Sequence, residues 1–315
     1  RRSFQLGGSA NVAANLAGLK CKVILAGVLG LDEPGQKLTS LLKEKNIQSK
    51  CIYAQQFPTI TKTRIMGGHQ QLLRIDEEQP DLLDGKVQST LFETLTEYIH
   101  SINAVILSDY GKGIFNNNFA QQCIQLCLKH RIPVFVDPKN RHWSNYSGAS
   151  CITPNIQEFN AVCQTMGLLD KNFEESGVKV REFFKLDKLL VTRGAQGMSL
   201  FSASDPPLNI PTKIKEVFDV SGAGDTVIAT LAACAATGCS FIKAVEFSNI
   251  AAGIVVSKLG TYAISFAELQ IALAELIDTQ LVEQRKMIES PGYAMSIIEH
   301  WRLSGKRIVF TNGCF

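Results

Sequence analysis

The stretch EVFDVSGAGDTVIATLAAC, residues 216–234, places a cluster of small residues between a β-like run and an apolar run with helical spacing. The cluster is Gly222-Ala223-Gly224, and it is followed directly by Asp225. Small residues lose much backbone entropy on folding and bury little surface. Their place at a junction between two elements therefore indicates a tight turn or a ligand that approaches the backbone.

The helix that follows this junction favours an anion at its start. Backbone N–H groups in a first helical turn have no intrahelical partner, and the helix dipole adds positive potential there. Side chains as small as those of residues 222–224 let a phosphate come within hydrogen-bond distance of that backbone. Asp225 is then either a cap or dipole partner of the helix, or a base that accepts a proton from an attacking hydroxyl. No Gly-Lys-Ser/Thr follows a glycine loop, so this is not the Walker form.

Outward from this junction, apolar β-branched runs alternate with helical patterns along most of the chain. Continuous apolar strands separated by helices predict a parallel sheet that is covered on both faces. We therefore predict an α/β fold with a mostly parallel central sheet, and ligands at the carboxyl ends of its strands. The strand-like runs are residues 21–30, 104–111, 132–138, 150–155, 188–194 and 197–203.

The composition excludes several classes of function. A chain of 315 residues with 45% hydrophobic residues can form a large α/β domain. A net charge of +3 gives no electrostatic case for nucleic acid, and no apolar run approaches the roughly 20 residues of a membrane span. The nine scattered cysteines include no Cys-x-x-Cys pair, which is typical of reduced thiols. We expect a cytoplasmic protein with no nucleic-acid or membrane partner and no signal peptide.

Residues 47–76 break the alternation of strands and helices. Short strands rich in Thr, Gln and Ile flank Gly67-Gly68, which predicts a small antiparallel flap on the α/β body. An ordinary surface hairpin would explain the same pattern. Because exposed strand edges are usually covered, we also expect the flap to be the contact of a homodimer.

Polar residues follow several predicted strands, at the edge where ligands bind. TPNIQEF supplies Asn155 and Glu158, which fit the capping box of an ordinary helix. They also fit a pair that holds hydrated magnesium and nucleotide phosphate. Lys112 and Lys139 follow two other strands, and with Arg74 on the flap they could neutralise a phosphorylated substrate.

Two glycine-containing turns complete the set. KLLVTRGAQGMSLF places Thr192, Arg193 and two glycines between two strands, a turn suited to lie against a nucleotide. Gly7-Gly8 opens a helix in which Asn11 either points its amide at a polyol or caps locally. Helix packing alone explains the two glycines equally well.

Together these motifs resemble the ribokinase-like, or phosphofructokinase-B, carbohydrate kinases. The Gly7-Gly8…Asn11 turn and the DVSGAGDT stretch look like the two signature motifs of that family. PTITKTRI, QQLLRID, LSDYGKG, DPK, TPNIQEF, LVTRGAQGMSL and KLGT, over about residues 7–265, are similar to the kinase domain of its bifunctional heptose 7-phosphate kinase/heptose 1-phosphate adenylyltransferase members.

The resemblance implies a role for each matching residue. Asp225 becomes the catalytic base, with Gly222, Ala223 and Gly224 as an anion hole. Asn155 and Glu158 would bind magnesium and the phosphates of ATP. The resemblance leaves open whether a monovalent cation also assists. The nucleotide site would comprise Asn155, Glu158, Thr192, Arg193, Gly194, Gly197, Asn249 and Gly253. The substrate side would comprise Gly7, Gly8, Asn11, Arg74, Asp109, Lys112 and Lys139.

The resemblance also implies a reaction. ATP would phosphorylate the anomeric hydroxyl of D-glycero-β-D-manno-heptose 7-phosphate to the 1,7-bisphosphate, in ADP-heptose and lipopolysaccharide synthesis. Another ribokinase-like sugar kinase, or a nucleotide- or sugar-binding relative that lost catalysis, are the alternatives. The intact Asp225 argues against a non-catalytic relative.

The resemblance divides the chain into two parts. Residues 1–280 are expected to form a ribokinase-like three-layer sandwich with a β flap, and the family's first strand is expected ahead of Gly7 and is missing. KRIVFTNGCF, at residues 306–315, is similar to the opening of a nucleotidyltransferase domain. We therefore expect the start of such a domain over residues 288–315, without adenylyltransferase activity from this stretch.

Overall fold

The structure is a computed structural model of the 315-residue chain. It describes residues 3–67, 70–78, 85–139, 142–168, 171–212, 218–258 and 260–274, with short pieces at 295, 298–299, 301–302, 305 and 307–309. The chain divides into two compact units, Arg1–Leu269 and Gln270–Phe315. Residues 288–315, where the start of a second domain is predicted, lie largely outside the described residues, so this domain stays a prediction.

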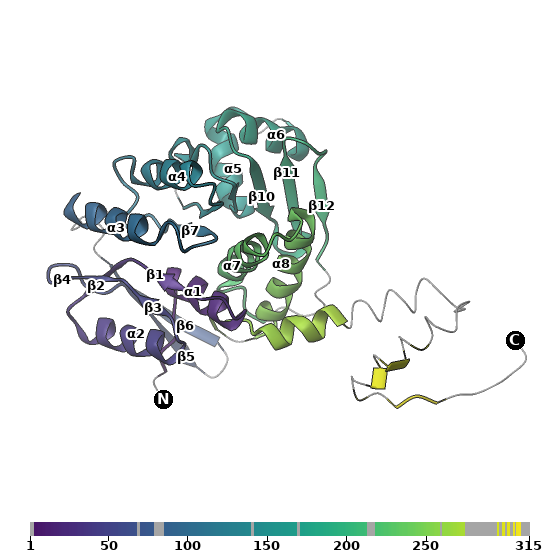
Figure 1. Ribbon diagram of the computed structural model, residues 1–315, viewed down its shortest axis with the longest axis horizontal. Coiled ribbons are helices and arrows are strands. Elements are labelled where there is room, and N and C mark those ends of the chain that lie inside the picture. Colours follow the sequence, from purple (N-terminus) through teal and green to yellow (C-terminus); the bar gives the residue numbers. More distant parts are fainter. Residues whose placement is uncertain are drawn as a thin grey trace, which may run out of the picture. The chain divides into compact units, whose positions relative to one another are not determined.

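A six-stranded sheet forms the centre of the first unit (Figure 1). Its strands are β7 (Val105–Ser108), β8 (Val134–Asp137), β9 (Cys151–Ile152), β10 (Lys188–Thr192), β11 (Met198–Ser202) and β12 (Leu208–Ile210). They lie in the order β12-β11-β10-β9-β8-β7. The pairs from β7 to β10 are parallel, and β11 and β12 are antiparallel additions at one edge. The predicted α/β fold with a mostly parallel sheet is confirmed.

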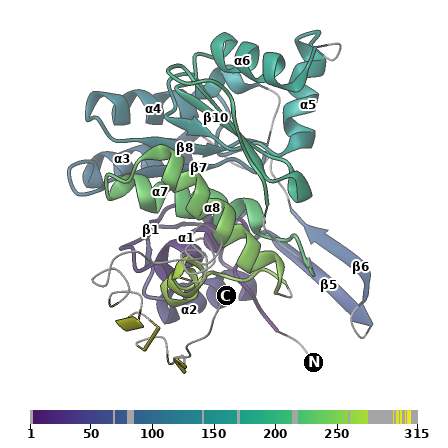
Figure 2. The same ribbon diagram turned by 90° about the vertical axis from the view of Figure 1, so that its right-hand side faces the viewer.

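Helices cover both faces of this sheet (Figure 2). One face carries α3 (Gly85–Tyr98), α4 (Phe119–Lys129), the 3₁₀ turn Trp143–Tyr146, α5 (Ile156–Thr165) and α6 (Phe173–Phe183). The other carries α7 (Ala223–Ala236) and α8 (Phe241–Val256), and α1 (Ser9–Gly18) packs against α7. The central strands are therefore apolar on both sides, which is why their sequences read as continuous apolar runs.

The amino-terminal part forms a short βαβ arrangement. β1 (Ile24–Leu25) and β2 (Val28–Gly30) run parallel to β3 (Gln48–Ser49) and β4 (Ile52–Ala54), with α2 (Glu33–Glu44) between them. The single strand predicted over residues 21–30 is therefore two short strands. The prediction that residues 47–54 belong to the flap was wrong, because they pair with β1 and β2. The cap Asp32, which accepts from the Gly35 N–H at 2.8 Å, starts the helix that makes this crossover.

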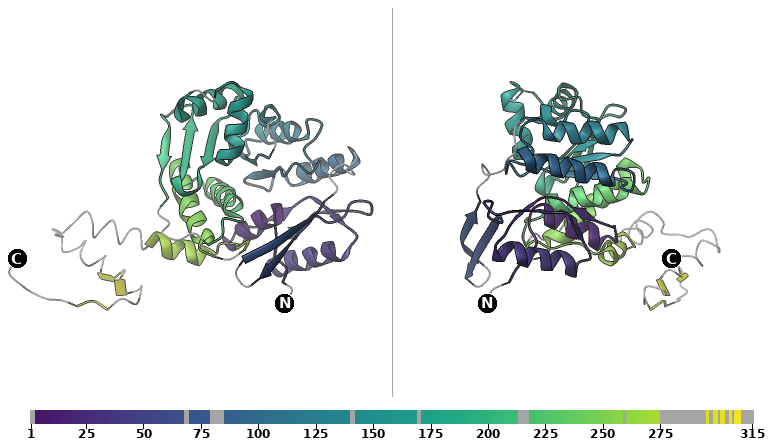
Figure 3. Two further views of the ribbon diagram at one scale, coloured as in Figure 1. Left: turned by 180° about the vertical axis from the view of Figure 1, so that it is seen from behind. Right: turned by 60° about the vertical axis from the view of Figure 1, so that its left-hand side comes forward.

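The flap itself is a two-stranded antiparallel ribbon (Figure 3). It consists of β5 (Thr61–Gly67) and β6 (Gln70–Glu77), and the register shifts between Ile65 and Met66. The predicted turn at Gly67-Gly68 extends outside the described residues. Asp32 accepts hydrogen bonds from the Thr59 N–H and hydroxyl, which fixes the chain two residues before the flap begins.

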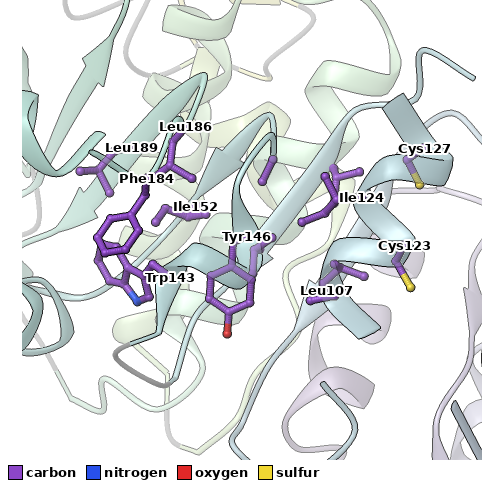
Figure 4. Close-up of a cluster of buried hydrophobic side chains, with 14 of the residues drawn as sticks. Leu107, Cys123, Ile124, Cys127, Trp143, Tyr146, Ile152, Phe184, Leu186 and Leu189 are labelled. Carbon is purple, nitrogen blue, oxygen red and sulfur yellow. The ribbon is translucent and has the colours of Figure 1, made fainter. Parts of the chain in front are cut away.

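The hydrophobic core lies on both sides of the six-stranded sheet, and Figure 4 shows part of the cluster on one side. Val134 and Val136 of β8 belong to the cluster that also holds residues of α4 and α5, whereas Phe135 belongs to the cluster under α7. Leu189 and Leu190 of β10 alternate in the same way. Fully burying one such side chain contributes about 1.5–3 kcal/mol, so the sheet is a rigid support for the loops at its carboxyl edge.

Candidate active site

The small-residue junction lies where α7 begins. Gly222 is its N-cap and has φ +83°, a left-handed conformation that favours glycine. A Cβ added there would lie 2.7 Å from Nδ2 of Asn11. Ala223, Gly224 and Asp225 form the first turn of the helix, so their N–H groups have no acceptor within it. The Gly222 backbone is thus required both for its conformation and for the close approach of α1.

Asp225 is half-buried, and both oxygens of its carboxylate accept hydrogen bonds. Nδ2 of Asn11 donates to Oδ2 at 2.7 Å, and the Tyr110 hydroxyl donates to Oδ1 at 2.7 Å. Burial raises the pKa of Asp225, while the bonds from Asn11 and Tyr110 act in the opposite direction. Because Gly222 is the N-cap and the carboxylate binds side chains of other elements, Asp225 is not the cap of α7.

A buried hydrogen-bond network ties α1 to α7 beneath the carboxylate. Nδ2 of Asn15 donates to the Asn11 carbonyl at 2.8 Å. Oδ1 of Asn15 accepts from the Thr226 hydroxyl at 2.9 Å and from the Ile264 N–H at 3.1 Å. Asn15 was not predicted as a site residue, although the four-residue spacing of the two asparagines places both on one face of a helix.

Asp219 braces the loop that leads to this junction. Its carboxylate accepts from the Ser221 N–H at 2.9 Å and from the Gly260 N–H at 3.1 Å. Burial raises the pKa of Asp219, but the bonds from Ser221 and Gly260 outweigh it, so the pKa lies below its usual value. An ionised Asp219 therefore holds the loop against the segment that follows α8.

Two further acids lie at the ends of β7 and β8. Asp109 is buried and accepts from the Gly111 N–H at 2.8 Å and from the Tyr146 hydroxyl. Asp137 was not predicted as a site residue, although it lies at the end of a predicted strand. Burial raises the pKa of Asp137 well above its usual value, and the negative charge of Asp225 adds to this. The carboxyl ends of β7 and β8 thus bring acidic groups toward Asp225, as expected for parallel strands.

Asn155 and Glu158 form the capping box that their spacing predicts. Oδ1 of Asn155 accepts from the N–H groups of Gln157 and Glu158 at 2.9 and 3.0 Å, and Oε2 of Glu158 accepts from the Asn155 N–H at 3.0 Å. Oε1 of Glu158 pairs with Lys139 Nζ at 3.0 Å. The capping interpretation is confirmed, and it places both side chains at the start of α5 beside Thr192.

The predicted nucleotide turn lies between β10 and β11. Arg193 does not extend freely: its guanidinium lies 4.5 Å from the Phe173 ring and donates to the Ser199 hydroxyl at 3.0 Å. Gly197 has φ +83°, and a Cβ there would meet the Ile210 carbonyl at 2.0 Å. Gly194, at φ +58°, makes the same tight turn.

The end of β12 brings this turn toward α8. Asn249 Nδ2 donates to the Pro211 carbonyl at 2.9 Å. A Cβ at Gly197 would also approach Pro211, so the turn and α8 share this strand end. Gly253 lies one turn further along α8. Asn249 and Gly197 thus both lie close to Pro211, whereas Asn155 lies beside Thr192 at the end of β10.

Each predicted basic substrate residue has an acidic neighbour. Arg74 Nε lies 2.9 Å from Asp76, and Lys112 Nζ lies 2.6 Å from Glu78. Lys139 is the third, through its pair with Glu158 described above. All three pairs are at least partly exposed, so solvent screens their charges and each pair can rearrange around an anion.

On the sugar side, Gly7 is exposed and Gly8 is the N-cap of α1. A Cβ added at Gly8 would lie 3.5 Å from the Tyr110 ring. The side chain of Asn11 is buried and directed at Asp225, so its predicted contact with a polyol stays a prediction.

A model of the pfkB family of carbohydrate kinases matches residues 1–267. The chain belongs to this family. Among its relatives, bifunctional protein HldE of Pasteurella multocida is 42% identical over 311 residues, which are 98% of this chain and 63% of that protein. HldE of Ectopseudomonas mendocina is 43% identical over 310 residues, with the same coverage. The chain spans less than two thirds of the length of these relatives.

Solved structures share the fold of this pfkB kinase. Phosphofructokinase-2 of Escherichia coli has a TM-score of 0.72 at 20% identity, covering 87% of this chain and 89% of that chain. Arabidopsis thaliana ribokinase, solved with ribose and ATP, has a TM-score of 0.67 at 18% identity, covering 85% and 87%. These likenesses confirm the ribokinase-like fold alone.

The described residues of this kinase contain neither a membrane-spanning helix nor a cluster of metal-ligating side chains. No helix among them is both long and apolar enough to cross a membrane. In the same part of the chain, no three His, Cys, Asp or Glu side chains gather into a preformed metal site.

Proposed function

We propose that this carbohydrate kinase transfers the γ-phosphoryl group of ATP to the anomeric hydroxyl of D-glycero-β-D-manno-heptose 7-phosphate. The observation that carries the proposal is the Asp225 carboxylate, held by two donors in the first turn of α7 beside the 222–224 backbone. The identity of 42% to HldE proteins supports the choice of sugar. Another sugar or sugar phosphate of the same family is the alternative substrate.

In this proposal, Asp225 accepts the proton as the anomeric oxygen attacks the γ-phosphorus. The new P–O bond forms while the bond to the β–γ bridging oxygen breaks, and ADP leaves with that electron pair. The N–H groups of the first turn of α7 offset the charge on the transferring group. Such transfer depends mainly on in-line positioning and charge neutralisation, and one good donor is worth roughly 3–4 kcal/mol.

Kinases of this family use ATP, and the residues at the start of α5 fit a hydrated magnesium ion. The Asn155 amide oxygen and both Glu158 oxygens already accept protein hydrogen bonds, so contact through the ion's water shell suits them better than direct ligation. Bound magnesium would neutralise phosphate charge. We assign the nucleotide phosphates to Asn155, Glu158 and the turn at Thr192–Gly197, with the base toward Asn249 and Gly253.

We also propose that the flap pairs two copies of the chain. Ile65, Leu73 and Ile75 lie on one face of the ribbon with exposures of 43, 52 and 44%. Lys62 and Arg64 lie on the other face, because successive side chains alternate. An isolated two-stranded ribbon is marginal in water, so covering this apolar face stabilises it.

The remaining assignments follow from the same family relationship. We assign residues 1–280 to the kinase domain and residues 288–315 to the start of a nucleotidyltransferase domain. A kinase that uses ATP and carries reduced thiols fits the cytoplasm. A monovalent cation is a further proposal, tested by adding potassium to the assay below.

A substrate panel tests the proposed function. The chain is assayed with ATP and with heptose 7-phosphate, fructose 6-phosphate, fructose 1-phosphate or ribose, and the product is identified by ³¹P NMR. We expect heptose 7-phosphate to give the 1,7-bisphosphate and ribose to give no product. Robust turnover of ribose would overturn the substrate assignment. Asp225→Asn should keep ATP binding and lose turnover; undiminished turnover would overturn its assignment as the base.

A further inference from the structure

We propose that Tyr110 is a positioning residue for the phosphoryl transfer, because its hydroxyl holds the Asp225 carboxylate in the orientation that accepts the substrate's proton. This inference rests on the proposed function of Asp225 as the base. Tyr110 lies in the segment after β7, and its hydroxyl donates to Oδ1 of Asp225 at 2.7 Å.

The backbone on both sides of Tyr110 is fixed. The Asp109 N–H donates to the Asp137 carbonyl at 3.0 Å, which continues the β7–β8 ladder to this residue. Oδ1 of Asp109 accepts from the Gly111 N–H at 2.8 Å, and the other oxygen accepts from the Tyr146 hydroxyl. Tyr110 therefore stands between two anchored residues.

The ring of Tyr110 is also packed. Gly8, at the start of α1, lies beside it, and a Cβ added there would make an ordinary contact with the ring at 3.5 Å. The bond to Asp225 and the anchored backbone on both sides hold the Tyr110 hydroxyl in place. Pre-set groups of this kind are what precise proton transfer requires.

Two donors from different elements define the carboxylate more fully than one. Asn11 comes from α1 and contacts Oδ2, whereas Tyr110 comes from the β7 loop and contacts Oδ1. The terminal torsion of an aspartate is broad when unconstrained, and this pair fixes both the position and the plane of the group. Each carboxylate oxygen keeps a further lone pair, so Asp225 can still accept a proton.

The hydrogen bond from Tyr110 also affects the pKa of Asp225. Asp137 from the end of β8 and Glu158 from α5 are acidic groups near Tyr110, and Lys139 pairs with Glu158. Burial already raises the pKa of Asp225, and the Tyr110 bond lowers it. Loss of this hydroxyl therefore raises the pKa of Asp225, so a larger fraction of the base is protonated and idle at a given pH.

Tyr110→Phe tests the inference, and Tyr146→Phe is the matched control. Both remove a tyrosine hydroxyl that donates to a carboxylate, but Tyr146 binds Asp109 instead of Asp225. For Tyr110→Phe with the sugar phosphate accepted in the panel, we expect the acidic limb of kcat/KM to move up by about one pH unit. We expect kcat to fall about tenfold or more, with the affinity for ATP unchanged. Tyr146→Phe should lower Tm without moving the acidic limb.

The outcomes separate this inference from the proposed function. An unmoved acidic limb in Tyr110→Phe would overturn the positioning role, even if the Tm of this variant falls. An equal shift of the acidic limb in Tyr146→Phe would also overturn it. Loss of turnover in Asp225→Asn together with a wild-type pH profile in Tyr110→Phe would support Asp225 as the base and would overturn only the positioning role of Tyr110. Full turnover in Asp225→Asn would overturn both the assignment of Asp225 as the base and the positioning role of Tyr110.

Discussion

Gly222→Ala is expected to damage both the stability and the activity of the kinase. The residue has φ +83°, and placing an L side chain in that region costs about 1–2 kcal/mol. The new Cβ would stand 2.7 Å from Nδ2 of Asn11, which is only 1% exposed and has little room to move. Displacing that amide breaks its bond to Asp225, and a hydrogen bond to a charged group is worth about 1.5–3 kcal/mol. The sum is a loss of about 2.5–5 kcal/mol in the free energy of unfolding.

Gly224→Ala is the matched control in the same turn. A Cβ at this position meets no atom within 4 Å, and the residue is helical. Gly-to-Ala at a compatible site stabilises by about 0.4–1 kcal/mol, so this variant should fold as well as the parent protein. Its methyl group would stand beside the first-turn N–H groups, where the proposed phosphoryl group lies, so activity should fall without a loss of stability.

The two variants are compared by urea unfolding and by an ADP-release assay. Gly222→Ala should lower the unfolding midpoint and reduce kcat about 100-fold, since small misplacements of catalytic groups have effects of that size. A parental midpoint for Gly222→Ala would refute the close approach to Asn11. Full activity in Gly224→Ala would refute the anion hole, whatever happens at Gly222.

Two further predictions concern charge and assembly. The pKa of Asp137 is raised in the folded state, mainly by burial. As pH rises, the carboxyl group therefore loses its proton in the unfolded chain before it does so in the folded protein. The free energy of unfolding then falls between the usual pKa of an aspartate and the raised pKa of the folded state. Asp137→Asn should therefore unfold at higher urea than the parent at pH 8 and nearly equally at pH 4; equal midpoints at both would contradict this. Leu73→Asp should convert a dimer into monomers in sedimentation experiments at unchanged Tm of the six-stranded body, and a persistent dimer would place the interface elsewhere.

Local sequence patterns predicted most strands of the main sheet and several site residues. Continuous apolar runs predicted the five strands from β7 to β11, because strands buried on both faces need apolar side chains at every position. The three-residue spacing of Asn155 and Glu158 predicted their capping box, since both bonds lie within one helical turn. The Gly-Ala-Gly-Asp junction likewise predicted a helix start.

Other features depend on chain segments that are distant in sequence. The run at 21–30 reads as one strand, but its break into β1 and β2 and the assignment of 48–54 to the body follow from pairing between the two segments. No local pattern could indicate that the Arg193 guanidinium lies over the Phe173 ring and donates a hydrogen bond to Ser199. These contacts bring together residues from different elements after the chain has folded.

The sequence by itself determined that an acid follows a glycine turn at a helix start, because conformation and helix dipole are local properties. Only the tertiary structure decided what surrounds that acid. Tyr110 and Asn11 lie far from Asp225 in sequence, and the packing of α1 and β7 around α7 places one donor on each of its oxygens. The physical reason is that a side chain's hydrogen-bond partners are set by which elements pack together, and that packing is a property of the whole sheet and its helices.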